Sequence, residues 1–174
     1  MSTLDLPTTA MKKLLFAAAA ALVALPAQAS MADVEAYIDL IQESGTQISF
    51  NENSFDKNCI DRAGYYHLDP GKQDLLVVCT SQVDEKDADA VWEVLAHEST
   101  HIMQACSETG YAFKAEYHPR IVRQLQSKAP HSSKMVDTTY KGHAQLQETE
   151  AFYMELQAPS DVMAAFTKLC FAEE

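Results

Sequence analysis

Residues 97–101 read His-Glu-Ser-Thr-His and lie within a stretch whose composition favours a helix throughout. On an α-helix, His97 and His101 are four residues apart, so their imidazoles project from the same face about one turn from each other. Both rings can then reach one metal ion, and Glu98 points toward the same small volume. The chain must therefore fold so that this helix face meets a third ligand and an opening to solvent.

The residues around the motif predict a helix that is mostly buried. Acidic residues gather between positions 84 and 89, where the positive end of the helix dipole stabilises their negative charge. Leu95, Ala96, Ile102 and Met103 place apolar side chains on both sides of the motif. We expect a helix over residues 84–106 that is open to solvent only at the metal site.

A hydrolytic zinc site needs three protein ligands and one open position. His97 and His101 would supply two nitrogen ligands, and Glu98 would act as general base on a zinc-activated water. The downstream carboxylates on a helix are Glu148, Glu150 and Glu155. Glu148 and Glu150 are about 200° apart around the helix axis, so only one of these two can face the metal. We favour Glu148, at the edge of the apolar side of that helix, and expect Glu150 to point further toward solvent.

Together these motifs resemble the gluzincin group of zinc metallopeptidases, in which His-Glu-x-x-His is joined by a glutamate on a later helix. The run Glu148-Thr149-Glu150-Ala151 is similar to the Glu-x-Glu/Gln-Ala pattern of several gluzincin families, whose first glutamate is a ligand. The resemblance implies a zincin-like fold, bound Zn²⁺ and hydrolysis of peptide bonds. Those families commonly place Asp or Asn four residues after the ligand glutamate to orient a histidine. Phe152 stands there, so the orienting partner must come from elsewhere.

The rest of the chain predicts an α+β fold, in which a small three-stranded sheet packs on the motif helix and the C-terminal half is helical. Hydrophobic spacing marks the helices, and β-prone runs around an Asp-Pro-Gly-Lys turn mark a hairpin. We expect Asp33 to cap the first helix, Pro130 to close the third and Pro-Ser-Asp at 159–161 to cap the last. The expected helices span residues 33–44, from between 84 and 89 to about 106, 117–127, 135–157 apart from Gly142, and 162–170, and the expected strands span residues 47–50, 65–68 and 75–79.

The first 29 residues have the features of an export signal. Two lysines after Met11 precede an apolar run from Leu14 to Leu25, and Ala27-Gln28-Ala29 matches the pattern at which signal peptides are cleaved. The apolar run is shorter than the about 20 residues of a membrane span. We expect residues 1–29 to be a signal peptide with residues 1–10 as an upstream extension. Residues 30–174 would then form a single secreted or periplasmic zincin-like metallopeptidase domain with no membrane span.

The four cysteines predict disulfides. None forms the C-x-x-C pair typical of a zinc site, and an even number in an exported chain suggests two bridges. Three pairings are open. We favour Cys59 with Cys79, across the sheet region, and Cys106 with Cys170, between the motif helix and the last helix.

Charge and motifs together indicate the class of function. The formal net charge of −12 argues against nucleic acid and against anionic membrane surfaces as partners. We expect a secreted zinc metallopeptidase that acts on a peptide or protein substrate. Tyr140, His143 and Tyr153 could stabilise its transition state, although each is expected to be structural. The alternative is a catalytically inactive exported zinc-binding or scaffold protein that acts through protein contacts. A zinc hydrolase for a non-peptide amide is a third, less favoured hypothesis.

Overall fold

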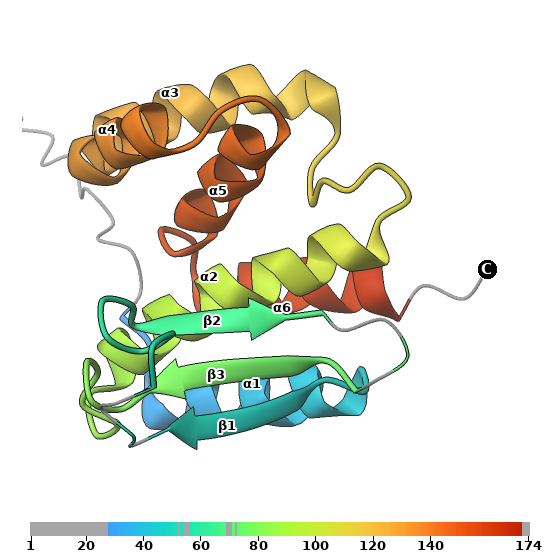
Figure 1. Cartoon of the computed structure of the whole chain (residues 1–174). Helices are drawn as coiled ribbons and strands as arrows, with labels where there is room; N and C mark the ends of the chain where they lie inside the picture. Colours follow the sequence, from blue (N-terminus) through green and yellow to red (C-terminus); the bar gives the residue numbers. More distant parts are fainter. Residues whose placement is uncertain (1–27, 52, 54–55, 69–70, 72, 172–174) are drawn as a thin grey trace, which may run out of the picture.

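The computed structural model describes residues 28–51, 53, 56–68, 71 and 73–171, so nearly all of the expected signal peptide lies outside the described residues. The chain has the expected α+β class (Figure 1). In chain order the elements are α1 (Met31–Glu43), β1 (Gln47–Asn51), β2 (Gly64–His67), β3 (Leu75–Cys79), α2 (Ala88–Cys106), the 3-10 helix η1 (Ala115–Tyr117), α3 (His118–Lys128), α4 (Pro130–Thr139), α5 (His143–Met154) and α6 (Pro159–Cys170).

The three strands form one mixed sheet in the order β1-β3-β2. The predicted hairpin is confirmed, because β2 runs antiparallel to β3 with Tyr65 opposite Val77. The first strand, β1, pairs with β3 in parallel. Both α1 and α2 pack against the sheet, as Figure 1 shows. The short strand β2 is therefore an outer strand, next to the helix that carries the motif.

The main core lies between the sheet, α1, α2 and α6. Alternate residues of β3 serve two faces: Leu76 and Val78 join the main core, while Val77 and Cys79 pack with Cys59 on the opposite face. Tyr37, at the centre of the core, packs against the rings of Trp92 and Phe166. Each fully buried large apolar side chain contributes about 1.5–3 kcal/mol, so this cluster fixes α2 firmly.

Two disulfides join the pairs that we favoured. Cys59–Cys79 closes the segment before β2 onto β3, and Cys106–Cys170 joins the ends of α2 and α6. Such bridges stabilise a fold mainly by restricting the unfolded chain. Because disulfides persist where thiols are not kept reduced, they indicate an oxidising compartment.

The expected helix over residues 135–157 was wrong. The structure divides this region into α4 and α5, and Gly142 between them has a φ of +61° that favours glycine. Pro130 ends α3 as expected, because Ala129 before it has left the helical conformation, and it also begins α4, where a first-turn residue needs no N–H. Asp33 is not the cap of α1. Ser30 caps this helix, and Asp33 completes a reciprocal capping box.

Candidate metal centre

The motif helix α2 is buried around its two histidines. Ser99 and Thr100 are fully buried, and the Ser99 hydroxyl lies 2.5 Å from the hydroxyl of Tyr37 on α1. By contrast, the side chains of His97 and His101 are 15% and 22% exposed. The face of α2 that carries Ser99 therefore packs against the core, while the face that carries the two histidines remains partly accessible to solvent.

Three side chains converge on this face. His97 and His101 from α2 and Glu148 from α5 each offer a ligand atom, and these atoms lie within 4.8 Å of one another. The His97 Nε2 atom is 3.5 Å from Glu148 Oε2, and the His101 Nε2 atom is 3.8 Å from Glu148 Oε1. Zinc bonds of about 2.0–2.2 Å place tetrahedral ligand atoms about 3.3–3.6 Å apart. The cluster could therefore hold a metal ion after small side-chain shifts.

The other nitrogen of His97 is held by Glu155, a carboxylate whose role the sequence did not reveal. His97 Nδ1 lies 2.6 Å from Glu155 Oε1. Phe152, at the position where gluzincin families commonly carry Asp or Asn, instead packs its ring edge-on against His97 at 4.6 Å between centroids. Glu155 is seven residues after Glu148, so two turns of helix bring it to the same side. The orienting partner thus comes from the end of the same helix.

An amide holds His101 in the corresponding way. Gln104 Oε1 lies 2.9 Å from His101 Nδ1. The Gln104 amide nitrogen donates to the Gln147 carbonyl and to Glu150, so its oxygen is the group left to accept from the imidazole. Both histidines are thereby directed to present Nε2 to the cluster.

Glu150 is fully buried, so the expectation that it points toward solvent was wrong. Its carboxylate accepts hydrogen bonds from the backbone N–H groups of Ala112 and Phe113, at 2.8 and 3.0 Å, and lies 2.8 Å from His118 Nε2. Gln104 supplies a fourth donor at 3.0 Å. Glu150 is fully engaged in fixing the segment after α2 and is not part of the histidine cluster.

The sequence could not show this role because the donors lie more than thirty positions away. Neither the helical periodicity nor the two-residue spacing contains information about the chain segment that covers the back of α5. Apolar periodicity alone assigned a buried carboxylate to the solvent side.

Electrostatics around His97 favour positive charge. Burial opposes protonation of His97, yet the hydrogen bonds to Glu148 and Glu155 raise its pKa to about 10. Burial also opposes ionisation of Glu148, but its hydrogen bond to His97 and the charges of both histidines lower its pKa. A cluster that stabilises a proton in this way would also stabilise a cation coordinated by the same side chains.

Glu98 lies beside the cluster in a protected position. Glu98 is 9% exposed, and this burial raises the pKa of its carboxyl group. The same carboxyl group accepts a hydrogen bond from the backbone N–H of Tyr66 on β2. The strand can approach so closely because of Gly64. A Cβ there would lie 2.4 Å from Val94 Cγ1 and 3.4 Å from Glu98 Cγ. A raised pKa suits a carboxylate that must accept and return a proton near neutral pH.

The three candidates for a transition-state donor differ in their surroundings. His143 Nδ1 is 2.6 Å from the Tyr111 hydroxyl, and the Tyr153 ring packs against Phe113. The pKa of Tyr140, by contrast, is affected by carboxylates of the site. Burial raises its pKa most, followed by the charge of Glu148, and the charge of Glu98 adds to this. The charges of Glu148 and Glu98 therefore act on the Tyr140 hydroxyl.

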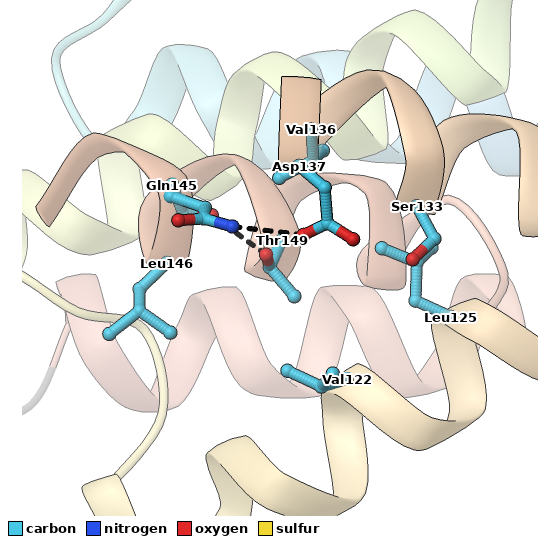
Figure 2. A pocket seen from close by; sticks show the side chains of 8 residues that line it. All are labelled: Val122, Leu125, Ser133, Val136, Asp137, Gln145, Leu146 and Thr149. Atoms are coloured by element: carbon cyan, nitrogen blue, oxygen red, sulfur yellow. Dashed lines mark hydrogen bonds between the residues drawn. The ribbon is translucent and has the colours of Figure 1, made fainter. Parts of the chain in front are cut away.

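Two pockets lie away from the histidine cluster. Figure 2 shows one between α3, α4 and α5, with a volume of about 210 Å³. Its lining includes Val122, Leu125 and Leu146, together with Asp137, which accepts a hydrogen bond from Gln145. The other pocket is lined by residues 80, 81 and 83–85. Neither of these two pockets includes a residue of the histidine cluster.

Comparison with known proteins identifies the family. Residues 28–171 match the family described as Domain of unknown function (DUF8637), and the chain therefore belongs to this family. No curated protein and no solved structure matches the chain.

Proposed function

We propose that this DUF8637 protein is an exported zinc-dependent metallopeptidase with a zincin-like fold. His97, His101 and Glu148 would be the zinc ligands, and Glu98 would be the general base. The observation that carries the proposal is the convergence of two Nε2 atoms and one carboxylate beside a buried glutamate. This arrangement also agrees with the resemblance to the gluzincin motifs.

The donor set favours zinc. Two imidazoles and one carboxylate form a known type of catalytic zinc site, which keeps one position open. Magnesium and calcium prefer oxygen ligands, so two histidines argue against them. Glu155 and Gln104 add the hydrogen bonds that zinc-bound histidines usually receive on their second nitrogen. When bound, zinc would supply Lewis-acid chemistry, lowering the pKa of a water molecule and polarising a carbonyl.

The chain's own residues would perform the proton transfers. Glu98, kept from solvent beside β2, would accept a proton from the attacking water and return it to the leaving amine. The Tyr140 hydroxyl would donate a hydrogen bond to the oxygen on which negative charge develops. Glu155 and Gln104 would hold the two imidazoles during this exchange.

The position of β2 favours a peptide over another amide. It is an outer strand of the sheet, and Tyr66 on this strand contacts Glu98 through its backbone. An extended peptide can add to such a strand by main-chain hydrogen bonds, which would bring its carbonyl groups near the general base. An isolated amide has no comparable means of alignment.

The test combines metal analysis with hydrolysis. We expect the purified protein to bind one equivalent of zinc, to cleave an unfolded protein substrate, and to lose cleavage with a chelator and regain it when zinc is restored. Glu98→Gln should retain zinc and lose activity by at least about a hundredfold. Glu108→Gln, at an exposed position just after α2, is the matched control and should keep full activity.

Two outcomes would contradict the proposal. Full activity in Glu98→Gln would remove the assigned general base. Stoichiometric zinc without cleavage of peptides would instead support the alternative of an exported zinc-binding protein that acts through protein contacts. A protein that binds no zinc would exclude the metallopeptidase and the zinc-binding protein, and would leave a scaffold protein that acts through protein contacts.

A further inference from the structure

Basic side chains concentrate in one part of this acidic chain. The segment from Lys114 to Lys141 contains six Lys or Arg residues and two acidic residues, whereas the whole chain has a formal charge of −12. The ion pairs within the described residues join histidines to glutamates, and none of them engages a Lys or Arg. Among the described residues, no carboxylate therefore forms a close ion pair with the positive charges of this segment.

The segment folds into α3 and α4, which pack on each other and on α5. Figure 1 shows both helices at the end of the molecule opposite the sheet. The buried residues of α3 are Ile121 and Leu125. Arg120 and Arg123 are one turn apart on the other side of this helix, and both are exposed. The hydrophobic side of α3 thus packs into the fold, while its two arginines form no ion pair with any residue in the described part of the chain.

Exposed apolar side chains accompany these charges. Tyr117, directly before α3, is 47% exposed, and Met135 on α4 is 38% exposed. Lys134 is next to Met135 and is also exposed. We use the name basic face for six exposed residues that belong to α3, to α4 or to the position directly before α3: Tyr117, Arg120, Arg123, Lys128, Lys134 and Met135. Cations beside exposed aromatic and apolar side chains are typical of surfaces that lie in a membrane interface.

We propose that the basic face docks on an anionic phospholipid surface. Its lysines and arginines would pair with lipid phosphates, and Tyr117 and Met135 would enter the headgroup region. The net negative charge of the chain would argue against an anionic lipid surface as a partner only if the charged residues were spread evenly over the molecule. Here most of the acidic residues precede Lys114, and α1 and the sheet lie at the opposite end of the molecule. Repulsion decays over a Debye length of about 8 Å at physiological salt.

A peripheral mode of attachment fits the helices of this fold. None of the described helices has the length and apolar character needed to cross a bilayer. A soluble polyanion could use the cations but would leave Tyr117 and Met135 without an apolar environment. The basic face contains no residue of the histidine cluster, so the proposal does not depend on zinc or on hydrolysis.

Co-sedimentation with lipid vesicles tests the proposal. The chain from Gln28 onward should be used, because it contains the described core and both disulfides and lacks the apolar run at 14–25, which could itself bind lipid. We expect binding to vesicles of equal phosphatidylglycerol and phosphatidylcholine, and none to phosphatidylcholine alone. Each basic residue near an anionic surface contributes about fivefold in affinity, so Arg120→Gln with Arg123→Gln should weaken binding about thirtyfold.

The control carries the same change of charge elsewhere. Lys86→Gln with Lys168→Gln alters two exposed lysines outside the basic face and should change binding by less than about threefold. Met135→Ser should weaken vesicle binding without changing retention on a heparin column. All four substitutions to Gln are at exposed positions, and circular dichroism should show unchanged melting temperatures.

Several results would overturn the proposal. These are absence of binding to anionic vesicles, equal binding to neutral vesicles, and equal losses in the double variant and its control. Retention on heparin without vesicle binding would also overturn it and assign the basic face to a soluble polyanion.

Discussion

Replacing Glu155 by glutamine should weaken zinc binding while leaving all three proposed ligands in place. The Glu155 carboxylate lies 2.6 Å from His97 Nδ1 and is 20% exposed. Its charge increases the electron density on the imidazole and fixes which nitrogen faces the cluster. Glutamine has nearly the same shape, so the substitution removes the charge with little change in packing.

The expected magnitude follows from the geometry. A hydrogen bond to a charged group contributes about 1.5–3 kcal/mol, and the short distance here places the interaction among the stronger ones. Glutamine can still accept one neutral hydrogen bond from the imidazole, which would retain part of this energy. We therefore expect Glu155→Gln to weaken zinc affinity by about 10- to 100-fold, the range found for such partners.

Competition with a zinc chelator at fixed pH measures this change. Glu35→Gln, an exposed position on α1, is a matched control and should bind zinc like the original protein. Glu155→Ala should weaken binding further, because Nδ1 would lose its protein partner. A thermal melt of each metal-free variant would show whether the loss arises from the site or from unfolding.

Unchanged zinc affinity in Glu155→Gln and Glu155→Ala would refute this reasoning. It would mean that the contact between His97 and Glu155 does not persist when a metal binds. A complete loss of zinc in Glu155→Gln would also contradict it, since an orienting residue should tune the affinity and a ligand should abolish it.

Three further predictions concern stability, catalysis and pH. Glu150→Gln should lower the stability of the metal-free protein by about 3–5 kcal/mol in urea unfolding, because it removes a fully buried carboxylate with four donors. Tyr140→Phe should reduce kcat by about 10- to 1,000-fold in steady-state assays with little change in KM, since it removes the proposed transition-state donor. The pKa of His97 rises on folding from 6.5 to about 10, so its contribution to the stability of the metal-free protein is complete below pH 6.5 and is lost as pH rises toward 10. Unfolding curves across this range should show that loss, and His97→Ala should reduce it.

Local patterns in the sequence predicted most of the fold. The strands at β1, β2 and β3 and the motif helix were found from residue type and periodicity, because each pattern depends on neighbours within a few positions. The division of residues 135–157 was missed. A run of helix-compatible residues outweighed Gly142, whose positive φ turns the chain between α4 and α5.

For the candidate site, the sequence determined the residue types and their spacing on single helices. His97, Glu98 and His101 share a face because the helix has 3.6 residues per turn, whatever surrounds it. The same helix geometry showed that only one of Glu148 and Glu150 could be the third metal ligand. It could not supply a sound reason for that choice, because burial on α5 depends on which distant segment covers it.

Only the tertiary structure decided which groups form hydrogen bonds to Nδ1 of the two histidines and so orient their rings. Glu155 approaches His97 from the end of α5, and Gln104 approaches His101 while it is held by Glu150. Glu150, in turn, is fixed by donors from the segment after α2 and from α3. Hydrogen bonds require atoms about 3 Å apart, and proximity between residues separated by dozens of positions arises only when the helices pack. The sequence therefore determined that a metal could be bound here, and the packing of α2 against α5 determined how its ligands are held.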